Sequence, residues 1–149
     1  MTPMRSLRRL VPAAALALVA LLLAVACTKD DATSPKRYPL TVNFANMNPH
    51  VGQDFYLRVV HEATGVEVGF TELEPITTAN FSLTVPDVLV AGESYRVDFY
   101  ADLNGNYAYD APPVDHAWRR LTGPVGAGPY VIDFTHDTIW VDIQFPPHG

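Results

Sequence analysis

The segment SYRVDFYAD (residues 94–102) alternates apolar and polar side chains, with Tyr95, Val97, Phe99 and Ala101 on one side. A period of two places alternate side chains on opposite faces of a β-strand. Valine, phenylalanine and tyrosine are also residue types that favour strands. The segment therefore predicts a half-buried strand with one face toward a core.

Similar segments recur on both sides of it, separated by turn residues, and no helical period extends beyond one turn. They cover residues 38–44, 55–61, 66–73, 80–86, 117–121, 129–134 and 137–145. The chain also contains 13 Pro and 9 Gly, which favour turns. This pattern predicts an all-β fold, an antiparallel immunoglobulin-like or transthyretin-like β-sandwich of about seven to eight strands.

The N-terminal 26 residues differ from this pattern. Three arginines precede VPAAALALVALLLAVA (residues 11–26), an apolar run that is short for a membrane span and suits an export signal. The run ends at Cys27, the only cysteine of the chain, so no intrachain disulfide can form. We therefore predict a signal peptide over residues 1–26.

Ala24 and Ala26 before Cys27, and TKDD after it, resemble the lipobox of bacterial lipoproteins. Ala24 stands where that pattern usually has leucine. The resemblance implies lipidation of Cys27 and a membrane-anchored location in the cell envelope, on the periplasmic or the cell-surface face. CTKDD is also similar to the Lys-Asp-Asp surface-export signal of some Bacteroidota lipoproteins, which implies the outer membrane. An ordinary signal peptide followed by an unrelated cysteine is the alternative.

Residues 27–38 are polar apart from Tyr38 and predict a flexible tether, followed by one β-sandwich domain over residues 39–147. Loss of residues 1–26 removes three Arg and no acid, which leaves 7 Lys and Arg against 16 Asp and Glu, a net charge of −9. This charge argues against nucleic acid as a partner and agrees with cation binding. The partners that we expect besides the membrane are an envelope protein or a glycan.

Oxygen-bearing groups stand at alternate positions of the polar segment 102–115: Asp102, Asn104, Asn106, the carbonyl of Ala108, and Asp110. This D-x-N-x-N-x-x-x-D spacing resembles the calcium loops of EF-hand and dockerin-like proteins and the D-x-N-G-N loops of exported bacterial β-sandwich modules. Calcium takes six to eight oxygen ligands, which a loop can supply from alternate residues. The segment therefore predicts a calcium site.

The loop departs from the EF-hand pattern at two positions. Tyr107 replaces the glycine of position 6, and Pro113 replaces the bidentate glutamate of position 12. The prediction is therefore a calcium site in a β-loop, with Asp115 completing the ligand set. The alternative is a plain turn without a metal. It could be a tight hairpin at Asn104-Gly105, in which the following residues pair back onto strand 94–102 and the carboxylates face solvent, and Asp and Asn can also stabilise such a turn through bonds to their own backbone.

Four histidine and methionine side chains are expected near this loop. If every connection of the sandwich reverses direction, loops 46–53, 74–79, 102–116 and 135–137 share one end. This end then carries Met47, His50, His116 and His136, whereas His61 lies at the other end. Imidazoles and a thioether suit copper or another transition metal, which gives an alternative function.

The D-x-N-G-N, D-H-A-W and F-x-H segments together resemble a group of exported bacterial proteins, which implies a shared architecture. The chain has no Gly-x-Ser-x-Gly segment, glycine-rich phosphate loop or Cys–His pair. We therefore expect a non-enzymatic module that binds calcium for structure or for partner binding, with copper binding as the alternative.

Overall fold

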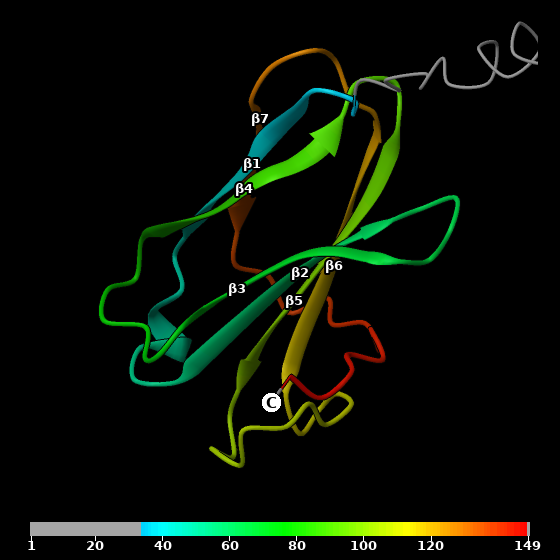
Figure 1. Ribbon diagram of the computed structural model, residues 1–149. Coiled ribbons are helices and arrows are strands. Elements are labelled where there is room, and N and C mark those ends of the chain that lie inside the picture. Colours follow the sequence, from blue (N-terminus) through cyan, green and yellow to red (C-terminus); the bar gives the residue numbers. More distant parts are fainter. Residues whose placement is uncertain (1–33, 149) are drawn as a thin grey trace, which may run out of the picture. The chain divides into compact units, whose positions relative to one another are not determined.

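Two β-sheets packed face to face form the described part of the chain, residues 34–148 of the computed structural model (Figure 1). The elements are β1 (Arg37–Ala45), the 3-10 helix η1 (Asn48–His50), β2 (Asp54–His61), β3 (Glu67–Leu73), β4 (Phe81–Val90), β5 (Ser94–Asp102), β6 (His116–Pro124) and β7 (Tyr130–Thr135). The prediction of an all-β sandwich is confirmed, and seven of the eight predicted segments form strands. No helix within these residues is long and apolar enough to cross a membrane.

The strand order is β4-β1-β7 in one sheet and β3-β2-β5-β6 in the other. In an immunoglobulin constant domain the first two strands share a sheet, whereas here they lie in different sheets. The order fits the transthyretin-like alternative. All pairs are antiparallel except β1 and β7. The parallel pair follows from the alternation of strand direction, because the first and seventh strands run the same way.

Aromatic side chains from both sheets form the centre of the core. The ring of Phe44 on β1 lies 4.9 Å from that of Phe55 and 5.1 Å from that of Phe99, both on the opposite sheet. Trp118 is fully buried beside Phe99 and Phe134. Burial of such side chains stabilises the fold by about 1.5–3 kcal/mol each.

Gly69 allows β3 to approach β4 closely at one edge of the sandwich. A Cβ atom at this position would lie 2.6 Å from Cγ1 of Val85 and 2.8 Å from Cγ2 of Val88. Any larger residue here would therefore force the side chains of Val85 and Val88, or the strands that carry them, to shift.

The start of the domain differs slightly from the prediction. Arg37 and Tyr38, which the sequence placed in the tether, belong to β1 and pair with Val90 and Leu89 of β4. The predicted signal peptide, Cys27 and most of the predicted tether lie outside the described residues.

The prediction of an eighth strand over residues 137–145 is wrong. Residues 137–148, here called the C-terminal strap, cross the outer face of the four-stranded sheet without forming a ladder. Ile143 and Phe145 of the strap pack with Tyr56 and Tyr100 in a second apolar cluster on this face. The Ile143 carbonyl accepts hydrogen bonds from arginine side chains instead of strand N–H groups. Alternating apolar residues therefore dock the strap on the sheet face.

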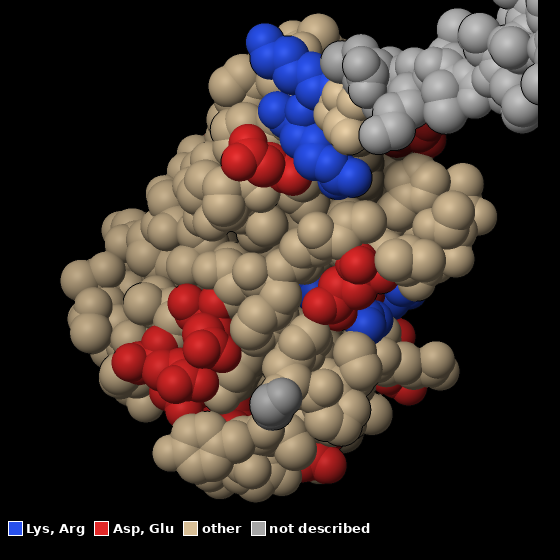
Figure 2. Space-filling view, viewed as in Figure 1, with Lys and Arg blue, Asp and Glu red and all other residues tan. Residues whose placement is uncertain are grey.

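Acidic side chains are unevenly distributed on the surface. Figure 2 shows a group of them near the end of the sandwich that carries η1 and the loop after β5. The four loops that the sequence predicted to meet lie at this same end.

Candidate functional site

Backbone hydrogen bonds join the loops at this end of the sandwich. The loop after β1 is tied to the loop after β3 by Met47 N to Ala79 O, at 2.8 Å, and by Ile76 N to Gln53 O, at 2.8 Å. The segment after β7 is tied to the end of β1 by His136 N to Ala45 O, at 2.9 Å. The structure therefore brings the predicted loops together, as reversal of direction at each connection requires.

The loop after β5 is organised by two buried carboxylates. Asp102 accepts hydrogen bonds from the amides of Gly105 (2.7 Å) and Tyr107 (2.8 Å). Asp115 accepts from the amides of Leu103 (3.0 Å) and Asp110 (2.8 Å). Asp102 is 2% exposed and Asp115 is fully buried. The two carboxylates thus fix the loop backbone at both of its ends.

The other predicted calcium ligands lie in the same network. Asp110 Oδ2 accepts from the side-chain amides of Asn104 (2.9 Å) and Asn106 (2.8 Å). The side-chain oxygen of Asn104 accepts from the amide of Asn106, and that of Asn106 accepts from the amide of Ala108. The predicted residues therefore converge, and hydrogen bonds within the loop hold them together.

The tight-hairpin form of the plain-turn alternative is wrong, whereas the bonds from loop amides to Asp102 and Asp115 are also those expected of a metal-free turn. β5 pairs directly with β6, with Ala101 opposite His116, and the residues between them form a long loop instead of two paired strands. Asp102 and Asp115 point inward and are buried, whereas the hairpin required solvent-facing carboxylates. Tyr107 adopts φ 61°, a left-handed conformation that few residues other than glycine adopt.

Further carboxylates lie next to this loop. Asp54 on β2 stands opposite Asp102 on β5, and burial raises the pKa of Asp54, as do the nearby charges of Glu74 and Asp102. Burial likewise raises the pKa of Asp115, with smaller contributions from Asp102 and Asp110. Sequence analysis missed both residues, because the pairing of β2 with β5 brings Asp54 beside the loop and the pairing of β2 with β3 brings Glu74 to Asp54.

No lysine or arginine neutralises the loop carboxylates. Within residues 34–148, no ion pair joins a basic side chain to Asp102, Asp110 or Asp115. The four backbone amides described above are the donors that stabilise the two buried groups. The carboxylates of this loop are therefore close together, and no Lys or Arg of residues 34–148 forms an ion pair with them.

Three of the predicted metal-binding histidines lie together. The ring centroid of His50 is 5.1 Å from that of His116 and 5.0 Å from that of His136. Nε2 of His50 lies 3.1 Å from Nε2 of His136, and Nδ1 of His50 bonds to Gln53. Met47 is fully buried in the main core.

His116 has an unusual environment. Its ring stacks on Trp140 of the C-terminal strap, with centroids 3.7 Å apart. Its Nδ1 atom and the Trp140 Nε1 atom are buried without a hydrogen-bond partner within the described residues. Burial lowers the pKa of both His50 and His116, and nearby histidines lower them further. Both imidazoles therefore favour the neutral form, which is the form that binds metals.

No protein-family model, curated protein or solved structure matches this chain. Within the described residues, no three His, Asp or Glu side chains have donor atoms grouped as in a preformed metal site. A metal would therefore have to reorient some of these side chains on binding.

The lowered pKa values of His50 and His116 predict a stability that falls in mild acid. The unfolded histidines take up protons near pH 6.5, whereas the folded ones take them up only at lower pH. Stability should therefore be lost as pH falls below about 6.5, by up to about 1.4 kcal/mol per pH unit for each histidine. Urea denaturation at pH 7.5 and 5.5 measures this difference.

The variant His116→Phe isolates the histidine contribution, because phenylalanine can keep the stacking on Trp140 but does not titrate. The free energy of unfolding of this variant should fall less between pH 7.5 and 5.5 than that of the wild type. The raised pKa values of Asp54 and Asp115 have the opposite effect at lower pH. They lower the stability of the folded state as pH rises above about 4, so acid relieves this cost. An identical acid sensitivity of the variant and the wild type would contradict the role of His116.

Proposed function

We infer that this chain is a non-enzymatic, lipid-anchored β-sandwich module of the cell envelope that binds calcium in the loop after β5. The ligands would be Asp102, Asn104, Asn106, the Ala108 carbonyl, Asp110 and Asp115. One observation carries this proposal. Asp102 and Asp115 are buried beside Asp110, and no basic side chain within residues 34–148 pairs with any of them. Buried charges in proteins are generally paired or bound to a metal.

The donor set fits calcium chemically. Each ionised carboxylate has about four acceptor positions, so the bonds from loop amides leave lone pairs for an ion. Asn104 and Asn106 would turn their side-chain oxygens toward the ion and release their bonds to Asp110. Tyr107 stands where calcium loops have a glycine for a sharp turn, and its φ of 61° supplies a left-handed turn at that position.

Calcium should stabilise the folded protein. A ligand that binds only the folded state stabilises it by about 2.7 kcal/mol at one hundred times its Kd. Millimolar calcium should therefore raise the Tm of chelator-treated protein, as measured by differential scanning calorimetry. Asp102→Asn should remove this rise, whereas Asp133→Asn, an exposed carboxylate bonded to Asn43, should keep it. An unchanged Tm of the wild type in calcium would sink the proposal.

The lipid anchor rests on Cys27 and the lipobox residues around it, and it brings the module to the membrane surface. Stable anchoring needs more than one acyl chain, because a single chain binds membranes only weakly. An envelope protein or a glycan at the loop end is the partner that agrees with this location.

Cys27→Ser should abolish incorporation of labelled fatty acid and shift the protein from the membrane fraction to the soluble fraction. Cell fractionation followed by immunoblotting measures the shift. Full retention of the variant in the membrane fraction would contradict the anchor.

A second candidate function is binding of copper or another transition metal by His50, His116 and His136. One specific observation favours it. Two bonds of about 2.0–2.1 Å from one ion place adjacent nitrogens roughly 3 Å apart, and Nε2 of His50 and His136 are 3.1 Å apart. The buried Nδ1 of His116 has no partner within the described residues and adds a third imidazole nearby. Met47 would be a ligand only if it moved out of the core.

Copper binding should depend on the histidine pair. Calorimetric titration of the full chain with Cu²⁺ should show a saturable site that is lost in His136→Ala, because two adjacent ligands become one. His61→Ala is the matched control, since His61 at the end of β2 pairs with Glu93 in the connection between β4 and β5. Equal binding by both variants would exclude this group as the copper site.

A further inference from the structure

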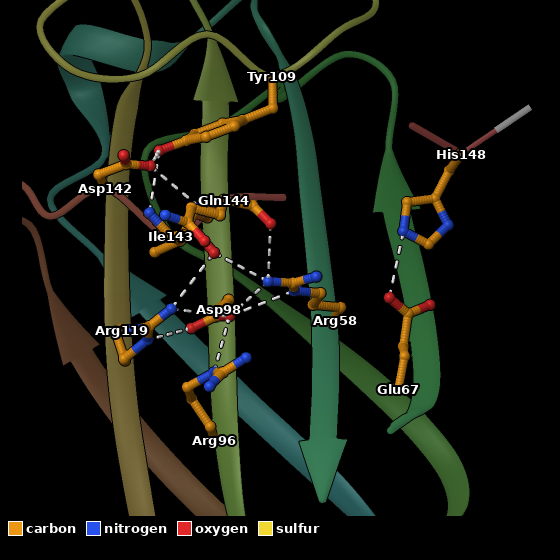
Figure 3. Close-up of polar contacts among 10 residues, drawn as sticks. All are labelled: Arg58, Glu67, Arg96, Asp98, Tyr109, Arg119, Asp142, Ile143, Gln144 and His148. Atoms are coloured by element: carbon orange, nitrogen blue, oxygen red, sulfur yellow. Dashed lines mark hydrogen bonds and ion pairs between the residues drawn. The ribbon is translucent and has the colours of Figure 1, made fainter. Parts of the chain in front are cut away.

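Three arginines surround a single carboxylate on the outer face of the four-stranded sheet. Asp98 on β5 stands opposite Arg58 on β2 and opposite Arg119 on β6, and Arg96 is two residues away on the same face. Asp98 is fully buried and accepts from Arg58 at 3.0 Å, from Arg96 at 3.1 Å and from Arg119 at 2.6 Å (Figure 3). This Arg–Asp cluster, made of these four residues, carries three positive charges and one negative charge.

A further acid at the rim does not neutralise the cluster fully. Asp142 of the C-terminal strap lies at the rim, where its Oδ1 accepts from the Tyr109 hydroxyl and the Gln144 amide. Even with Asp142 counted, one positive charge is left over. This excess is notable in a chain whose formal net charge is −6.

The cluster has hydrogen-bond donors that the protein does not use. Arg58 and Arg119 use their Nε and Nη2 groups for Asp98 and for strap carbonyls. Arg96 uses only Nε, on Asp98. Within the described residues, the Nη1 groups of all three arginines and the Nη2 group of Arg96 therefore have no protein acceptor. These N–H groups are therefore free to bond a ligand.

A pocket of about 360 Å³ opens over these donors. It is lined by Arg58, Arg96 and Arg119 and by strap residues Asp142, Ile143 and Gln144. The Arg58 side chain is 8% exposed, whereas those of Arg96 and Arg119 are 30% and 33% exposed. One guanidinium is thus held firmly at the base, and two flank an opening that reaches solvent.

We propose that this pocket binds a small oxyanion, namely a phosphate, sulfate or carboxylate group. The planar guanidinium presents its N–H donors in a fork that matches the oxygens of such groups, and bonds between two charged groups are stronger than neutral ones. Asp98 holds the three forks in place and leaves a positive charge for the anion to neutralise. The site lies on the outer sheet face, and Tyr109 of the loop after β5 bonds Asp142 and Ile143 at its rim.

The test is a titration of the full chain with inorganic phosphate, sulfate and acetate at constant ionic strength, with chloride as the reference salt. Binding is followed by NMR of the arginine Nε–Hε signals, which a merely structural cluster would not shift. At least one of the three anions should produce saturable shifts, and chloride should not. A higher affinity for phosphate or sulfate than for acetate indicates that the site binds a tetrahedral group. The reverse order of affinities indicates that it binds a carboxylate.

Arg96→Gln should weaken the binding by roughly tenfold or more, because it removes free donors while Arg58 and Arg119 still hold Asp98. Arg120→Gln is the matched control, since Arg120 pairs with Asp137 and lies over Phe134, away from the pocket. If Arg96→Gln fails to fold, Arg119→Lys replaces it, because lysine keeps the charge but not the fork. Absence of saturable shifts with all three anions, or equal weakening by Arg96→Gln and Arg120→Gln, overturns the proposal.

Discussion

The side chains of β5 alternate strictly between the two faces of its sheet, and most of the structure depends on this alternation. The inward residues are Tyr95, Val97, Phe99 and Ala101. They lie in the main core, where Phe99 contacts rings from the opposite sheet. The outward residues include Asp98, which fixes the arginines of both neighbouring strands. The last residue, Asp102, begins the acidic loop. A shift of one residue would exchange the two faces and bury the charges among the aromatic rings.

The sequence predicted the strands well because their apolar residues follow a period of two and their turns contain Gly, Pro, Asn and Asp. The same period led to the wrong prediction of a strand over residues 137–145. Alternation shows that a segment is extended with one apolar face, but it does not show whether its backbone pairs with a strand. In the strap, arginine side chains from β2 and β6 bind the Ile143 carbonyl, and the backbone bond from Val141 N to the Ala117 carbonyl of β6 does not extend into a ladder. The Arg–Asp cluster was missed for the same reason, since it depends on the register between β2, β5 and β6.

The candidate site was predicted in part. Reversal of direction at each connection places His50, His116 and His136 at one end, and this reasoning needs only the number of strands. The details of the loop required the structure. Asn104-Gly105 is a strong hairpin signal, but Asp102 bonds the amides of Gly105 and Tyr107, so side chain–backbone bonds outweigh the local turn preference. The stacking of Trp140 on His116 depends on the path of the strap and has no counterpart in local sequence.

The parallel pairing of β1 with β7 has a consequence for how the chain acquires its structure. Leu40 pairs with Tyr130, and the bond between Asn43 and Asp133 spans 90 residues. The three-stranded sheet is therefore incomplete until nearly the whole domain has been synthesised, and contacts of such high sequence separation slow folding. Until β7 pairs with it, β1 has an unpaired edge, and the partly folded chain is most vulnerable to aggregation in this interval.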